Sequence, residues 1–264
     1  MTTAPAQPAA ARSEPSGVRA AEARPLPYPL RSLRLHLAEK ANAFLAPMLI
    51  LLAVVVVTVL IGLVIGIATG FPLPDAVGEG FRSNNLGMFW AVTGFFISSA
   101  ALSMNRTFTT VLALGATRRD YWLGSTAGFA VTSLVFALYS LLLLLVEKAT
   151  GGWFLGVHAL DVTVLGDGDP LRTVVTVFLF ALGSLLLGAA FGTVFRAYGA
   201  RVLTAIILAA ALVVIGLVAL AVWQWDTTLQ LVSGTGAWLP SLILLVLVLV
   251  GAGGSFVAIR RASV

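Results

Sequence analysis

One short polar stretch lies between two apolar runs, and its four charged residues are the side chains best placed for chemistry. Segment 105–125, named the elbow here, reads NRTFTTVLALGATRRDYWLGS and carries Arg106, Arg118, Arg119 and Asp120. No nucleophile–base pair accompanies these charges, and the two histidines of the chain are isolated. We interpret the elbow as a surface on which a partner protein acts.

The first half of the elbow has the pattern of a short helix. Residues 106–114 suffice for about two helical turns, and Phe108, Val111 and Leu112 fall on one stripe. Gly115 suits a helix C-terminus, where a left-handed residue ends the hydrogen-bond ladder. We expect Phe108 and Leu112 to belong to the partner-binding surface.

The second half of the elbow has the pattern of a helix start. Thr117 precedes Asp120 by three residues, the spacing of a capping box with Asp in place of the usual Glu or Gln. A helix beginning at about Arg118 would continue into the next apolar run, so force on the short helix would pass to it. The alternative is a simple basic loop that flanks a membrane helix.

The sequence lacks the common signatures of nucleotide and metal sites. A Walker A motif needs Gly-Lys-Ser or Gly-Lys-Thr, but Lys40 and Lys148 are both followed by Ala. Asp161, Asp167 and Asp169 lack the DxDxDG spacing and the glutamate of a calcium loop, so we expect a solvated loop there. We predict that the chain is not an enzyme and binds no metal or cofactor itself.

Composition places the chain in a membrane. Of its 264 residues 59% are hydrophobic and 10% charged, whereas a soluble domain is about 25% charged. Six apolar runs reach the roughly 18 residues that cross a hydrocarbon core as a helix. They cover residues 43–70, 87–104, 122–146, 174–195, 202–223 and 239–259. The fold class expected is therefore an all-α polytopic membrane protein with six transmembrane helices.

The N-terminal residues divide into two parts. Residues 1–29 are rich in Ala, Pro, Ser and Arg without a hydrophobic period, which predicts a disordered tail. Residues 30–42 mix leucines with basic side chains and are too short to span, which favours an amphipathic helix at the membrane interface over a solvated lead-in. The membrane domain would then cover residues 30–264.

Basic residues give the orientation. Thirteen of the 16 Lys and Arg residues fall in one set of connections, and only Arg82, Lys148 and Arg172 fall in the other. The positive-inside rule then places both termini in the cytoplasm. Because topology explains the net charge of +5, no nucleic-acid partner is needed.

Small residues recur at four-residue spacing inside the apolar runs. Gly62 and Gly66 form one row, and Ser184, Gly188 and Gly192 form another. Such rows allow helix backbones to approach closely in lipid. They would serve packing within the chain or a dimer face.

The elbow resembles a segment of bacterial ABC-2-type ABC transporter permeases. In many of these a Gly-x-Thr-Arg-Arg-Asp segment, followed by aromatic residues and a Gly, leads into the third membrane helix. Here the matching residues are Gly115 to Asp120 with Tyr121, Trp122 and Gly124. Six helices, a basic interfacial helix and cytoplasmic termini agree with that family, whereas the connection 224–240 is shorter than in many relatives.

The resemblance implies a function and a set of partners. It predicts a permease in the bacterial cytoplasmic membrane that exports an amphipathic or lipid-like substrate. A separate ATPase subunit, which binds ATP and Mg, would dock on the cytoplasmic loop 105–121, and a second permease subunit would complete the path. Gly115, Thr117, Arg118, Arg119 and Asp120 take the coupling role by position. The rival hypothesis is a non-transporting membrane scaffold or sensor that binds a signalling protein through the same loop.

Overall fold

The computed structural model describes residues 41–71, 73–84, 87–113, 115–225 and 238–261, and in this part of the chain it is helical without strands. The predicted tail 1–29 lies outside the described residues, as does most of the predicted interfacial helix 30–42. Four helices in the described part are long and apolar enough to cross a membrane. They are Ala43–Thr69, Arg118–Ala149, Pro170–Trp223 and Leu239–Arg260.

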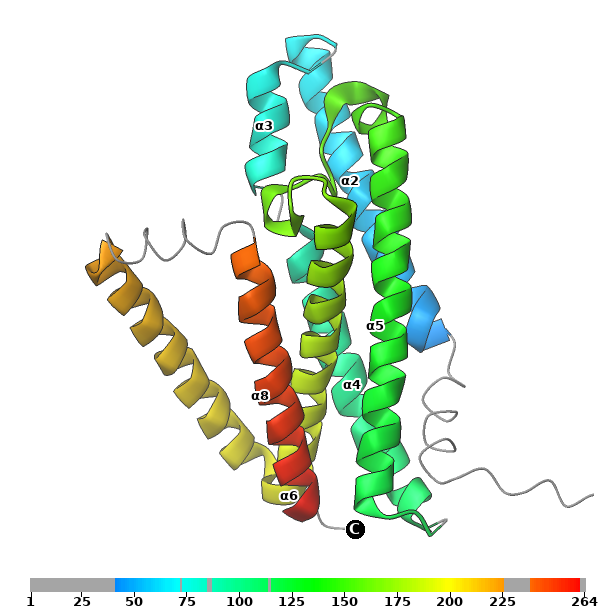
Figure 1. Cartoon of the computed structure of the whole chain (residues 1–264), viewed down its shortest axis with the longest axis vertical. Helices are drawn as coiled ribbons and strands as arrows, with labels where there is room; N and C mark the ends of the chain where they lie inside the picture. The colour runs from blue at the N-terminus through cyan, green and yellow to red at the C-terminus, as the bar shows by residue number, and fades with distance from the viewer. Residues whose placement is uncertain (1–40, 72, 85–86, 114, 226–237, 262–264) are drawn as a thin grey trace, which may run out of the picture.

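Helix α2 (Ala46–Thr69) follows a π-helical turn at Ala41–Leu45 and contains no charged residue. It ends at Gly70, whose φ of 97° turns the chain and whose N–H bonds the Gly66 carbonyl. The short helix α3 (Asp75–Asn84) follows and lies at the same end of the molecule as the last turns of α2 (Figure 1). Asp75 lies in the first turn of α3 and Arg82 in the last, as the helix dipole favours.

Helix α4 (Gly87–Ala113) joins two elements that the sequence analysis separated. The predicted span 87–104 and residues 106–113 of the predicted short helix form one continuous helix. Asn105 and Arg106 do not break it, because neither side chain prevents helical backbone geometry. Arg106 is the one charged residue of α4, and the 27 residues of this helix are enough to span a hydrocarbon core.

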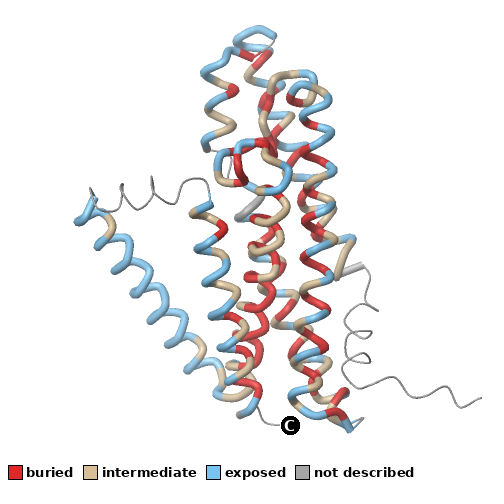
Figure 2. Tube along the Cα trace, viewed as in Figure 1, coloured by how far each residue is buried: buried red, intermediate tan, exposed pale blue. Residues whose placement is uncertain are grey.

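Helix α6 (Pro170–Trp223) covers the predicted spans 174–195 and 202–223 in 54 residues. Asp169 caps its start by accepting hydrogen bonds from two backbone N–H groups. At Gly199 the backbone has φ 81° and ψ 178°, which interrupts the helix where the sequence predicted a connection. The second half then leaves the bundle and is exposed along nearly its whole length (Figures 1 and 2).

The core lies between α2, α4, α5 (Arg118–Ala149), the first half of α6 and α8 (Leu239–Arg261). Phe96 and Phe136 meet edge to face at 5.1 Å between α4 and α5, and both are 1% exposed. This packing fixes α4 and α5 relative to each other, and with them the two ends of the elbow.

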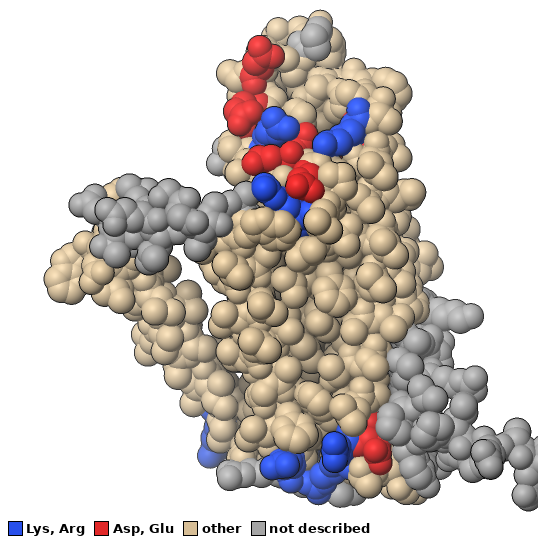
Figure 3. Space-filling model, in the orientation of Figure 1, with Lys and Arg blue, Asp and Glu red and all other residues tan. Residues whose placement is uncertain are grey.

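Charged side chains gather at the two ends of the bundle (Figure 3). The basic end, as named here, carries Arg106, Arg118, Arg119, Asp120, Arg196, Arg201 and Arg260. The acidic end carries Asp75, Glu79, Arg82, Glu147, Lys148, Asp161, Asp167, Asp169 and Arg172. Between Asp120 and Glu147, α5 contains no charged residue. This distribution is what a bilayer requires of a spanning bundle.

Candidate functional site

Within the elbow, helix α4 ends in a C-terminal cap at Gly115. Gly115 has φ 86°, its N–H bonds the Leu112 carbonyl at 2.9 Å, and the Ala116 N–H bonds the Val111 carbonyl at 3.3 Å. This pair of bonds is the Schellman arrangement, with buried Ala116 and Val111 supplying its apolar contact. The predicted helix C-terminus at Gly115 is therefore present, although the helix it ends is α4.

Helix α5 then starts with the predicted capping box. The Asp120 N–H donates to Thr117 Oγ1 at 3.1 Å, and the Thr117 N–H donates to Asp120 Oδ2 at 3.4 Å. The Thr117 hydroxyl also donates to Asp120 Oδ2 at 2.7 Å. Carbonyl groups at the end of α4 and N–H groups at the start of α5 thus have hydrogen-bond partners within the turn. These bonds stabilise one conformation of the turn.

Aromatic packing fixes the inner face of the elbow. Phe108 is 2% exposed and contacts the Tyr121 ring edge to face at 5.3 Å. Fully buried Tyr121 shares a 2.7 Å hydrogen bond with Thr107 Oγ1. Phe108 therefore has no surface to offer a partner, contrary to expectation. Leu112 is only half-buried but packs against the same core. The apolar stripe faces inward because the helix end packs against α5.

Hydrogen bonds from Arg118 and from Trp122 join the elbow to the last helix, α8. The Arg118 guanidinium donates to the backbone carbonyls of Arg260 at 2.6 Å and Ile259 at 3.4 Å. One turn further along α5, Trp122 Nε1 donates to the buried Ser255 hydroxyl at 3.1 Å. The start of α5 and the end of α8 are thereby held together.

Arg196 of α6 completes the arrangement and was not among the predicted site residues. Its guanidinium donates to the Asn105 carbonyl at 3.0 Å and lies 5.0 Å from the centre of the Phe108 ring. Arg196 follows an apolar run in the sequence, where a basic residue is expected for topology alone. Its tertiary role depends on a helix 91 residues away, which no local pattern reveals.

The outer face of the elbow is polar and accessible. Arg106, Gly115, Thr117 and Arg119 are exposed, and Arg118 and Asp120 are partly exposed. The structure gives Arg119 no hydrogen bond or ion pair with another described residue. This face suits an acidic partner surface. Within the described part of the chain, no cluster of three His, Asp or Glu side chains could hold a metal ion.

The second predicted row of small residues packs within the chain. Ser184 is 2% exposed, a Cβ at Gly188 would collide with the Ile97 carbonyl, and a Cβ at Gly192 would lie 2.8 Å from the Ala101 carbonyl oxygen. The absence of side chains therefore lets α6 and α4 approach backbone to backbone.

The first row of small residues, Gly62 and Gly66, packs against side chains of connecting segments and not against another helix. A Cβ at Gly62 would collide with Val157, and one at Gly66 with the Phe71 ring. Both partners come from connecting segments near the acidic end. The expected helix-to-helix contact at this row is therefore replaced by contacts with the connections.

Glu147 is the main feature that the sequence analysis missed. It directly follows the predicted span 122–146, but it belongs to the last turns of α5 and is 1% exposed. Its carboxylate accepts hydrogen bonds from the N–H groups of Ala159, Leu160 and Asp161 at 2.8–3.1 Å and from Trp153 Nε1 at 3.2 Å. The carboxylate therefore organises the loop that follows α5.

Asp161 in the same loop is also structural. It was expected to be solvated, but it is 6% exposed and forms a 2.8 Å ion pair with Arg82 of α3. His158 Nδ1 lies 3.6 Å from the Asp161 carboxylate and 3.8 Å from that of Glu147. These groups hold α3 and the loop together at the acidic end.

Comparison of the chain with family models, with curated proteins and with solved structures gave no match.

Proposed function

We propose that the chain is the permease subunit of a transporter driven by a separate ATPase, which docks on the outer face of the elbow. The observation that carries the proposal is the bond from Arg118 to the end of α8. Because of it, a displacement of the accessible turn at Gly115–Thr117 acts on α4, α5 and α8 together. A plain connecting loop would need neither the two helix caps nor this tie.

The membrane architecture of the proposal has six spans. Helix α6 is long enough at 54 residues to cross twice, with Gly199 as the break between crossings, and α4 supplies a further span. The basic end faces the cytoplasm by the positive-inside rule, and both termini lie there. The chain is then a multi-pass protein of the bacterial cytoplasmic membrane.

The energy and the second half of the path come from other subunits in this proposal. ATP and Mg belong to the partner ATPase, because the chain has no Walker A sequence. A second permease subunit covers apolar surface such as the exposed second half of α6, where Leu212 is 69% exposed. The cargo is amphipathic and is exported.

Affinity purification of the tagged full chain from its native membranes tests the proposal. We expect an ATPase to co-purify and Mg-dependent ATP hydrolysis to appear in the eluate. Arg119→Glu should reduce both at least tenfold, because it reverses a charge on the docking face without removing an internal hydrogen bond. Arg201→Glu is the matched control at the same end of the bundle.

Two results would contradict the proposal. One is equal ATPase recovery with Arg119→Glu and with the unmodified chain. The other is recovery of a signalling protein without any ATP-hydrolysing subunit, which would favour the scaffold hypothesis.

A further inference from the structure

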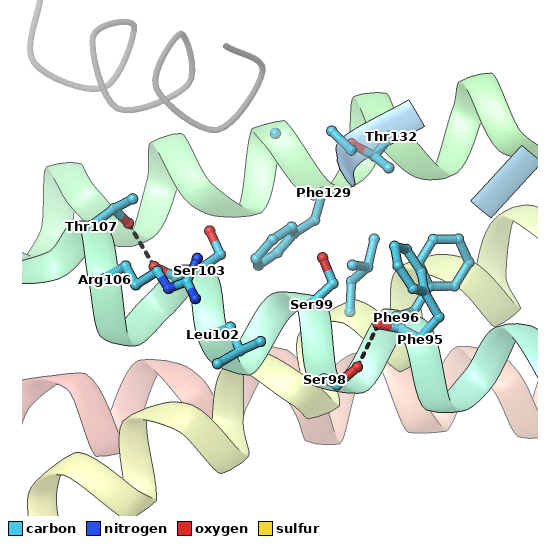
Figure 4. Close-up of a pocket in the computed structure, with 13 residues that line it drawn as sticks. Phe95, Phe96, Ser98, Ser99, Leu102, Ser103, Arg106, Thr107, Phe129 and Thr132 are labelled. Carbon is cyan, nitrogen blue, oxygen red and sulfur yellow. Dashed lines mark hydrogen bonds between the residues drawn. The ribbon is translucent and has the colours of Figure 1, made fainter. Parts of the chain in front are cut away.

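A cavity of about 230 Å³ lies between α4 and α5 (Figure 4). Its α4 wall extends from Phe95 to Thr107, and its α5 wall from Gly128 to Thr132. From Phe95 to Arg106 the helix rises about 16 Å at 1.5 Å per residue. The cavity is therefore an elongated slot along α4.

One end of the slot is cationic and polar. Arg106 and Ser103 line it one helical turn apart, and the structure gives neither side chain a hydrogen-bond or ion-pair partner among the described residues. By contrast, the neighbouring Thr107 hydroxyl is already bonded to the Ser103 carbonyl and to Tyr121. A guanidinium at the edge of an apolar bundle is stabilised by an anion, and its planar donors suit phosphate and carboxylate oxygens.

The other end of the slot is apolar and aromatic. Phe95, Phe96 and Phe129 line it, and Leu102 lies between them and the polar end (Figure 4). Along the slot the Ser99 and Thr132 hydroxyls also have no hydrogen-bond partner among the described residues. The lining thus changes from cationic through hydroxylated to aromatic over the length of the cavity.

We propose that this slot binds an anionic amphiphile, with its phosphate or carboxylate head at Arg106 and Ser103 and its alkyl chain against the phenylalanines. A small inorganic anion would use only the polar end, and a neutral hydrocarbon would leave Arg106 without a counter-ion. The gradient of the lining matches a molecule that has both parts. As a statement about exported cargo this inference rests on the proposed function, whereas ligand binding by the chain alone does not.

Photocrosslinking of the purified full chain in phosphatidylcholine nanodiscs tests the inference without any ATPase. The probe is a twelve-carbon alkyl phosphate with a diazirine near the end of its chain; an alkyl alcohol with the same diazirine is the uncharged control. We expect the phosphate probe to label the peptides containing Phe95–Leu102 and Gly128–Thr132. The alcohol should label them at least tenfold less.

Three variants sharpen the test. Arg106→Gln should reduce labelling about tenfold or more, because it removes the charge-assisted contact with the anionic head. Ser99→Leu should reduce it by filling the slot without changing the charge. Arg201→Gln removes a charge from the same end of the bundle outside the slot and should leave labelling unchanged.

Each contrary outcome overturns a defined part of the inference. Equal labelling by the alcohol and the phosphate probe would exclude selection of the anion. If Arg106→Gln and Arg201→Gln reduced labelling equally, the effect would come from the overall surface charge and not from the slot. Full competition by millimolar inorganic phosphate would make the site one for a free anion and exclude the amphiphile.

Discussion

The Arg118 guanidinium hydrogen-bonds the backbone carbonyl of Arg260 at 2.6 Å, across 142 residues of sequence. The donor lies in the first turn of α5 and the acceptor at the C-terminal end of α8, where free carbonyls and the negative end of the helix dipole attract a cation. The neighbouring Arg119 is exposed and has no bond with another described residue. Two adjacent arginines therefore have different tasks, one internal and one facing outward.

This difference leads to the first prediction. Arg118→Ala should accelerate hydrogen exchange in the last two turns of α8, because the tie stabilises them by about 1 kcal/mol for a partly exposed charged donor. Arg119→Ala should leave that exchange unchanged. The measurement is hydrogen–deuterium exchange of the two variants in the same detergent. Equal exchange in both variants would contradict the structural role of Arg118.

Close packing of α6 on α4 leads to the second prediction. Gly188→Ala should lower the free energy of unfolding by about 1–3 kcal/mol, because its Cβ meets the Ile97 backbone and forces the helices apart. Gly216→Ala is the matched control, since nothing lies within 4 Å of a Cβ at that position. Thermal unfolding followed by tryptophan fluorescence measures both. A Gly188→Ala variant as stable as Gly216→Ala would argue against this helix contact.

The buried carboxylate at the acidic end leads to the third prediction. Glu147→Ala should destabilise the protein by about 3 kcal/mol or more, because three backbone N–H groups lose their acceptor and each buried unpaired group costs about 1–3 kcal/mol. Glu147→Gln should lose less, since its amide oxygen still accepts. Glu79→Gln, an exposed acid at the same end, should change the melting temperature little. If Glu147→Ala melted like Glu79→Gln, the loop would not depend on this carboxylate.

Topology supplies the fourth prediction, and the absence of native cysteine makes it simple to test. Arg119→Cys and Asp75→Cys lie at opposite ends of the bundle and are both exposed. In intact cells a membrane-impermeant maleimide should label Asp75→Cys at once and Arg119→Cys only after permeabilisation. The reverse labelling pattern would contradict the proposed orientation. It would place the elbow outside the cell, where a cytoplasmic ATPase could not dock.

Local patterns predicted the turn of the elbow correctly. Gly115 ends a helix and Thr117 with Asp120 starts the next one, because caps depend on residues within one turn of each other. The six apolar runs also correspond to helical segments of the structure. Helix α4 was divided wrongly because polar residues near Arg106 were read as the end of a span, whereas helical backbone tolerates them.

Contacts between distant segments could not be predicted. The Glu147 carboxylate is bound by N–H groups 12 to 14 residues away, and Asp161 pairs with Arg82 across 79 residues. The inward direction of Phe108 likewise depends on where Tyr121 lies once the turn has formed. Residue type and spacing alone do not distinguish these buried side chains from ones that face solvent or a partner.

Helix α5 has 32 residues and is therefore about 48 Å long, which exceeds the roughly 30 Å of a hydrocarbon core. Thr117 caps one end and the Glu147 carboxylate organises the loop at the other. Because α5 is one unbroken helix between these two points, a tilt of α5 at one end also moves its other end. In the proposed permease, binding at the elbow would therefore change the shape presented at the opposite end of α5.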